Sequence, residues 1–231
     1  MMEAARTSQE PPACPLCGAR EAVALLARHR GRSFYRCGVC RLVFVPSAQH
    51  PTPAAARRRY DLHRNSPSDA GYCRFLGRLI APLAERLAPG AEGLDFGSGP
   101  TPVLSRLLTE RGFRMTLYDL HYASDRAALG RTYDFAVSCE TLEHLAEPGK
   151  DLELLRRLVR PGGWLAIMTG LATAETDFTS WHYAADETHV CFFSRETLAW
   201  WFARRGLSAE FPGPNLCFVQ VNTSPAVPAR V

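Results

Sequence analysis

The sequence predicts an α/β fold in which a doubly wound, mostly parallel sheet follows a small N-terminal zinc ribbon. Two Cys-x-x-Cys pairs stand near the start of the chain, apolar strands alternate with amphipathic helices from residue 71 onward, and a glycine turn follows the first of those strands. The predicted organisation is a flexible N-terminus at 1–12, a zinc ribbon at 13–48, a linker at 49–70, the α/β domain at 71–221 and a flexible tail at 222–231.

Composition supports a folded, cytoplasmic protein. The chain has 231 residues, of which 46% are hydrophobic, enough for one well-buried domain and a small appendage. No apolar run is long enough to span a bilayer, and the first twelve residues lack a signal-peptide core. Eight cysteines in such a chain indicate metal or structural thiols rather than disulfides.

Charge is distributed unevenly along the chain. Residues 1–64 hold eleven arginines and four acids, a formal charge of +7, whereas the remainder is formally −3. A basic front end permits contact with RNA or a phosphorylated substrate, and a solvated arginine-rich surface is the alternative.

The four N-terminal cysteines have the spacing of a structural zinc site. Cys14 and Cys17 form one pair, Cys37 and Cys40 the other, and nineteen residues separate them. A segment of about 40 residues builds too small a core, so a metal would hold it together. The alternative is a handle for substrate or RNA, with Phe34 and Tyr35 available for stacking. Its basic residues would be Arg28, His29, Arg30, Arg32, Arg36 and Arg41. The other cysteines are expected to be core or half-buried thiols: Cys73, Cys139, Cys191 and Cys217.

Before the glycine turn, the expected elements are three short ribbon strands (23–26, 33–36 and 42–45), a basic helix at 54–60 and an amphipathic helix at 72–87. A strand then ends at Phe96, and Gly97-Ser98-Gly99 turns the chain. Thr101 followed by Pro102 predicts a helix start with Thr101 as N-cap, and Gly112 predicts its end.

A regular strand–helix alternation follows the turn. The expected strands are 114–118, 133–139, 164–168, 207–211 and 217–221, and the expected helices are 150–159 and 194–205. This alternation predicts a Rossmann-like sheet with helices on both faces and a ligand beyond the carboxyl ends of the strands.

Asp119 narrows the ligand class. It ends the second strand, where a carboxylate can bind both hydroxyls of a cofactor ribose. A dinucleotide would need a third glycine where Thr101-Pro102 stand, and Asp95 disfavours a pyrophosphate but suits an ammonium group. We therefore expect an adenosine that carries an amino-acid tail.

These stretches resemble the class I S-adenosylmethionine-dependent methyltransferases. The resemblance covers 94–99, 118–119, 133–145 with its Glu143-His144, and 158–168 with its Arg-Pro-Gly-Gly. It implies that Asp119 binds the ribose and that Cys139 and Glu140 cover the cofactor near its methyl group. The residues it implies at the methionine end are Asp95, Phe96, Gly97, Ser98 and Gly99. One departure is that only fourteen residues separate Asp119 from Asp134, which predicts at most a short helix at 121–131 and a reduced adenine pocket.

A histidine-rich segment is the candidate source of a general base, because histidine is suited to proton transfer near neutral pH. The Thr-His-x-x-Phe-Phe-Ser stretch that contains His189 is similar to one in zinc-ribbon-bearing sugar C-methyltransferases, where the histidine serves as base. His189 is the first candidate, followed by His182, Tyr183 and His144. A structural role is the alternative for His189 and the favoured one for His144.

The leading functional hypothesis is methyl transfer to oxygen or carbon of a small metabolite, with a sugar nucleotide as one example. The first alternative is an RNA base methyltransferase that uses the ribbon to bind RNA. The second is a non-catalytic regulator that binds S-adenosylmethionine.

Overall fold

The structure is a computed structural model and describes residues 10–62 and 65–222. The predicted flexible ends, 1–12 and 222–231, lie almost wholly outside these residues. Within the described part, none of the helices has the length and apolar character required to cross a membrane.

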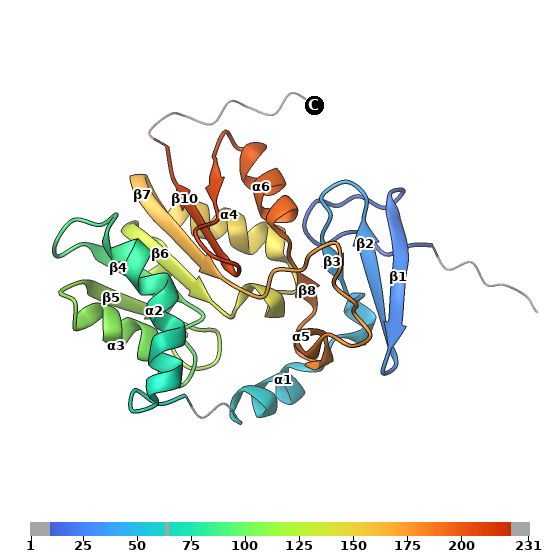
Figure 1. The fold of residues 1–231 in the computed structure, drawn as a ribbon, viewed down its shortest axis with the longest axis horizontal. Helices are drawn as coiled ribbons and strands as arrows, with labels where there is room; N and C mark the ends of the chain where they lie inside the picture. Colours follow the sequence, from blue (N-terminus) through green and yellow to red (C-terminus); the bar gives the residue numbers. More distant parts are fainter. Residues whose placement is uncertain (1–9, 63–64, 223–231) are drawn as a thin grey trace, which may run out of the picture.

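A six-stranded sheet forms the centre of the molecule, in the order β5-β4-β6-β7-β10-β9 (Figure 1). Its strands are β4 (Glu92–Phe96), β5 (Arg114–Tyr118), β6 (Tyr133–Cys139), β7 (Val159–Met168), β9 (Ala209–Glu210) and β10 (Leu216–Gln220). β5, β4, β6 and β7 pair in parallel, while β10 is antiparallel to both β7 and β9. The predicted α/β class and the mostly parallel sheet are confirmed.

Helices cover both faces of this sheet. α2 (Ala70–Ala84) and α3 (Val103–Thr109) pack in one apolar cluster, and α4 (Pro148–Leu158) and α6 (Arg195–Ala203) pack in the other. Along β6, Phe135 and Val137 join the first cluster, whereas Ala136 between them joins the second. This alternation is what a doubly covered strand requires, since successive side chains point to opposite faces.

Two local predictions about loops are wrong. Thr101 does not cap α3: the N-cap is Pro102, and the Thr101 carbonyl accepts the Val103 N–H at 2.8 Å in a tight turn that delays the helix. The strand predicted at 164–168 begins earlier, at Val159, so β7 also includes Pro161-Gly162-Gly163. Gly163 allows this, because a Cβ there would lie 2.3 Å from the Asp134 carbonyl oxygen on β6. The N-caps of α2 and α6 are Asp69 and Ser194, whose side chains accept hydrogen bonds from the amides they cap.

The N-terminal segment forms a second sheet that also includes a strand from the far end of the chain. Its order is β1-β2-β3-β8, with β1 (Val23–His29), β2 (Arg32–Cys37) and β3 (Val43–Phe44) from the front of the chain. β8 (Cys191–Phe192) follows the short helix α5 (His182–Ala185) and pairs with β3 (Figure 1). No sequence pattern predicts β8, which has only two residues.

Short helices connect and border these sheets. η1 (Ser47–Gln49) and α1 (Pro53–Tyr60) lie between β3 and α2. η2 (Arg126–Gly130) is the short helix expected between β5 and β6, and η3 (Leu142–His144) follows β6.

Candidate active site

A cavity of about 550 Å³ opens at the carboxyl ends of β4, β5 and β6. All eight predicted cofactor residues line it, as do His144, Tyr183 and His189. The predicted candidate that lies elsewhere is His182, which is exposed at the start of α5. His182 instead lines a smaller cavity of about 270 Å³ with Trp181 and Asn215.

The glycine turn brings backbone close to this cavity. Gly97 has φ +83° and donates its N–H to the Tyr118 carbonyl at 2.8 Å. A Cβ at Gly97 would lie 2.3 Å from the Thr141 side chain. Gly99 has φ +66°, but a Cβ there would meet no heavy atom of the described chain within 4 Å. The open side of Gly99 therefore leaves room for a ligand that touches the backbone.

Two acidic side chains border the turn and have different hydrogen-bond partners. Asp119 follows β5 and accepts the Gly99 N–H at 2.9 Å, while its other oxygen accepts the N–H groups of His121 and Tyr122. Asp95 is 2% exposed and accepts the Ser105 hydroxyl at 2.7 Å. Burial raises the pKa of Asp95 to about 6, although the bond from Ser105 lowers it.

Ser98 adds an unused donor to the same turn. Its hydroxyl oxygen is buried and has no hydrogen-bond partner among the described residues. Buried polar atoms are usually paired, so this hydroxyl is suited to a polar ligand in the cavity.

Cys139 and Glu140 form the wall after β6, and the pKa values of both groups are raised. Burial raises the pKa of the Cys139 thiol well above its ordinary value, which disfavours the thiolate form. Burial and the nearby Glu143 raise the pKa of Glu140 to about 8, while a hydrogen bond from Tyr183 lowers it. Glu140 also has φ +49°, which turns the chain over the cavity.

The His189 ring has a defined tautomer. Its Nδ1 lies 2.7 Å from the Tyr183 carbonyl oxygen, which only accepts, so Nδ1 carries the proton and Nε2 keeps a lone pair. Burial lowers the pKa of His189 to about 4, partly opposed by Glu143. The ring centroid is 4.2 Å from that of Tyr183 and 4.7 Å from that of His144. His189 is thus a neutral base candidate at ordinary pH.

Glu143 lies close to the two histidines. It is fully buried; one oxygen accepts the Thr169 hydroxyl at 2.8 Å, and the other has no hydrogen-bond partner among the described residues and lies 3.9 Å from Nε2 of His144. His144 Nδ1 lies 3.0 Å from the Thr188 carbonyl oxygen. Ligand atoms of Glu143, His144 and His189 lie within 4.8 Å of one another, so these residues could also hold a cation.

The Tyr183 hydroxyl is hydrogen-bonded to neighbouring residues rather than free for the cavity. It accepts the Gly170 N–H at 2.9 Å and lies 3.1 Å from the Thr169 hydroxyl. Its ring also fills the space where a Cβ of Gly170 would be, with the nearest atom at 2.6 Å.

Sequence reasoning missed Tyr60, Glu143 and Asp186 as cavity residues. Tyr60 ends α1 in the expected linker, and its ring meets that of His144 edge-on at 5.1 Å. Burial raises the pKa of Tyr60 to about 12. Only tertiary structure brings this linker residue to the cavity, whereas Glu143 was marked by its place beside His144 in the resembling stretch.

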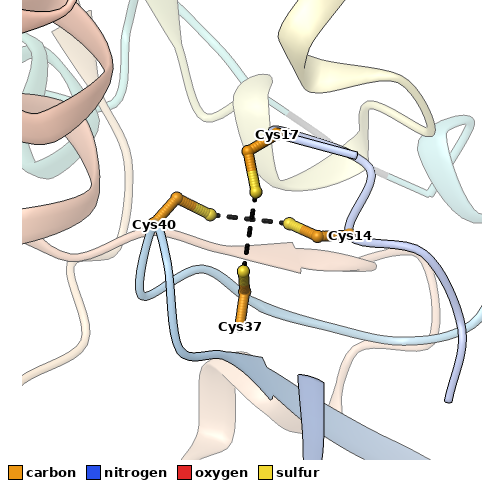
Figure 2. A group of neighbouring side chains, drawn as sticks. All are labelled: Cys14, Cys17, Cys37 and Cys40. Carbon is orange, nitrogen blue, oxygen red and sulfur yellow. Dashed lines mark hydrogen bonds between the residues drawn. The ribbon is translucent and has the colours of Figure 1, made fainter. Parts of the chain in front are cut away.

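The four N-terminal cysteines converge on one point (Figure 2). The Sγ atoms of Cys14 and Cys40 lie 3.5 Å apart, as do those of Cys17 and Cys37, and all four lie within 4.8 Å of one another. A tetrahedral zinc with Zn–S bonds of about 2.3 Å requires sulfurs about 3.8 Å apart, so this donor set fits zinc.

The ribbon is a poorer RNA handle than its sequence suggests. Phe34 is 0% exposed and packs against Phe178 and Phe192, so it cannot stack on a base. Arg32 is also engaged, by carbonyl groups of the segment that carries His189.

Comparisons with known proteins agree with this geometry. A family model described as "Methyltransferase domain" matches residues 63–210. A ubiquinone biosynthesis O-methyltransferase of Cereibacter sphaeroides is 34% identical over 93 residues, which cover 40% of this chain and 37% of that protein. Its counterpart in Vibrio cholerae is 29% identical over 93 residues, covering 40% of this chain and 38% of the relative. The match thus spans less than two fifths of these relatives.

Among solved structures, a sugar N-methyltransferase from Streptoalloteichus superposes with a TM-score of 0.52 at 13% identity. The superposition covers 72% of this chain and 92% of that one, and it shows a shared fold.

Proposed function

The chain belongs to the class I S-adenosylmethionine-dependent methyltransferases, and from this premise we propose that it methylates an oxygen or carbon atom of a small, sugar-like metabolite with His189 as general base. The observation that carries the proposal is the fixed tautomer of His189. The Nδ1 proton is held by the Tyr183 carbonyl, so Nε2 is left to accept a proton at the cavity.

The cofactor assignments rest on the shape and polarity of the glycine turn. Asp119 is proposed to bind the ribose with lone pairs that its three backbone bonds leave free. The Ser98 hydroxyl and the open side of Gly99 would face the methionine end, near Asp95. Leu120 is 71% exposed beside Asp119 and offers an apolar surface for the adenine.

When bound, the cofactor supplies an electrophilic methyl group on a sulfonium. His189 Nε2 takes the proton from the acceptor O–H or C–H, and the buried Glu143 carboxylate favours the imidazolium that results. Tyr60 and Tyr183 narrow the cavity on the side of the histidines and exclude water. His144 is proposed to support His189 by ring contact.

A small acceptor is supported by several observations together. The relatives are named as O-methyltransferases of ubiquinone biosynthesis, and the structural neighbour is named as a sugar N-methyltransferase. The buried Phe34 and the engaged Arg32 weaken the RNA alternative. For the four-cysteine cluster we propose one structural zinc ion.

The acceptor can be found by incubating metabolite extracts with methyl-labelled cofactor and identifying labelled products by mass spectrometry. A labelled small molecule that disappears with the His189→Gln variant is the expected result. Labelled RNA, with no labelled metabolite, would contradict the proposal. If the His189→Gln variant labels the same small molecule as fully as the wild type, the methyltransferase assignment stands, but His189 is not the general base.

A further inference from the structure

The segment that carries His189 is held by a side chain from the other end of the chain. Arg32 is the first residue of β2, and its guanidinium reaches α5 and the loop after it. Nη1 donates to the carbonyl oxygens of Ala184 at 3.1 Å and Asp186 at 2.8 Å, and Nη2 donates to the carbonyl of His189 itself. One planar fork thereby fixes three carbonyl groups within six residues of loop.

We propose that Arg32 is a positioning residue for His189, so that the ribbon is a working part of the active site. The proposal rests on the proposed function in one respect, the role of His189 as base. It assigns to the ribbon the task of aiming Nε2 at the acceptor.

Other bonds also hold this stretch: His144 Nδ1 lies 3.0 Å from the Thr188 carbonyl oxygen, and the Val190 N–H donates to the Glu143 carbonyl at 2.8 Å. His189 bonds to its own loop, through Nδ1 to the Tyr183 carbonyl and through its N–H to the Asp186 carbonyl at 3.2 Å. The Asp186 carboxylate in turn accepts the N–H and hydroxyl of Thr188, and it accepts bonds from Nε and Nη2 of Arg59 on α1. These bonds tie the stretch to itself, to α1 and to the segment after β6, whereas Arg32 ties three of its carbonyl groups, that of His189 included, to β2.

The guanidinium is itself held in place. It lies 5.3 Å from the centroid of the Phe34 ring, which is fully buried against Phe178 and Phe192. β2 is paired on both sides, and the sheet continues through β3 into β8, which begins two residues after His189. The stretch that carries His189 is therefore fixed on one side by the bonds from Arg32 and on the other by the pairing of β8 with β3.

The four-cysteine cluster lies at the other end of the same strand. Cys37 is the last residue of β2, five positions after Arg32. Closing the cluster fixes this strand, and the strand carries the guanidinium to the loop. A ribbon that lost its fold would therefore release the base while the cofactor turn on β4 and β5 stayed intact.

The test compares Arg32→Ala, Arg32→Lys and the control Arg20→Ala, an exposed arginine of the same ribbon. Hydrogen exchange at residues 183–190 is measured first, because it needs no acceptor. Loss of three charge-assisted bonds predicts a fall in protection of about 10- to 100-fold in Arg32→Ala. Arg32→Lys should be intermediate because an ammonium cannot fork between three carbonyls, and Arg20→Ala should match the wild type.

Three further measurements separate positioning from general damage. Zinc content and affinity for S-adenosylmethionine should stay within about twofold of wild type, whereas kcat with the acceptor should fall at least about tenfold with little change in KM. Unchanged protection of 183–190 in Arg32→Ala would refute the proposal. Lost protection with full kcat would show a structural contact only. A wild type that transfers no methyl group would refute the proposed function instead, and the exchange result would still stand.

Discussion

Three glycines of similar backbone conformation allow strain, packing and ligand contact to be measured separately. Gly97, Gly99 and Gly112 have φ of +83°, +66° and +88°. A Cβ at Gly97 would overlap Thr141 at 2.3 Å, whereas a Cβ at Gly99 or Gly112 would meet no atom of the described chain within 4 Å. Gly99 lines the cavity, and Gly112 lies beyond the end of α3.

Alanine at each position gives a distinct expected result. Gly112→Ala and Gly99→Ala should each lower the free energy of unfolding by about 1 kcal/mol, the cost of the left-handed conformation. Gly97→Ala adds overpacking against Thr141, so its loss should reach about 2–4 kcal/mol. For S-adenosylmethionine, Gly99→Ala should weaken binding by at least about tenfold, because the new methyl group occupies the space of the ligand.

Urea unfolding and calorimetry with S-adenosylmethionine measure these two effects on the same samples. Gly112→Ala is the matched control, since it carries the strain without the ligand contact, and it should bind the cofactor as the wild type does. Equal cofactor affinity in Gly99→Ala and Gly112→Ala would refute the placement of the cofactor on the turn. Equal stability of Gly97→Ala and Gly112→Ala would refute the packing argument.

Further predictions concern the base, the ribose ligand and the metal. His189→Gln should lower kcat by about 10²- to 10⁴-fold with cofactor affinity unchanged; full activity would exclude it as base. Since the folded pKa of His189 is lowered to about 4, the unfolded state binds more protons between about pH 4 and 6.5, and stability should fall as the pH falls through that window. Urea unfolding at pH 7 and pH 4.5 should show this loss in the wild type and a smaller one in His189→Gln; equal losses would show that the imidazole does not titrate this way. Asp119→Ala should weaken cofactor binding at least about tenfold by calorimetry, whereas Asp125→Ala, which loses only the cap of η2, should not. Metal analysis should give about one zinc per chain in the wild type and in Cys73→Ser, and less in Cys17→Ser with a less stable fold; a metal-free, equally stable Cys17→Ser would contradict the structural role.

Sequence reasoning was accurate where a local pattern decides the structure. β5 and β6 have the predicted bounds, and the residues proposed to bind the cofactor line one cavity because parallel strands place their carboxyl ends together. The four cysteines meet because paired turns at that spacing leave few other arrangements. In each case the decisive contacts are close in sequence or follow from strand order.

Contacts across large sequence separations were beyond the reach of these patterns. Arg32 reads as a surface arginine, yet it bonds to carbonyl groups more than 150 positions away. Phe34 reads as an exposed aromatic of a small ribbon, yet β8 and Phe178 cover it completely. A two-residue strand such as β8 has no periodicity to detect, so the sequence does not predict that β8 joins the sheet of the N-terminal segment.

The short segment between β5 and β6 shows how such distant contacts complete the site. Only η2 occupies this stretch, which leaves the side of the cavity beside Asp119 without a full helix and strand. The linker supplies the missing wall: the Tyr122 hydroxyl donates to Asp61 at 2.6 Å, and the rings of His121 and Tyr60 lie 5.8 Å apart. Since Tyr60 also contacts His144, α1 joins the Asp119 side of the cavity to the histidine side. Residues of α1 and of the short segment between β5 and β6 therefore together form one wall of the cavity.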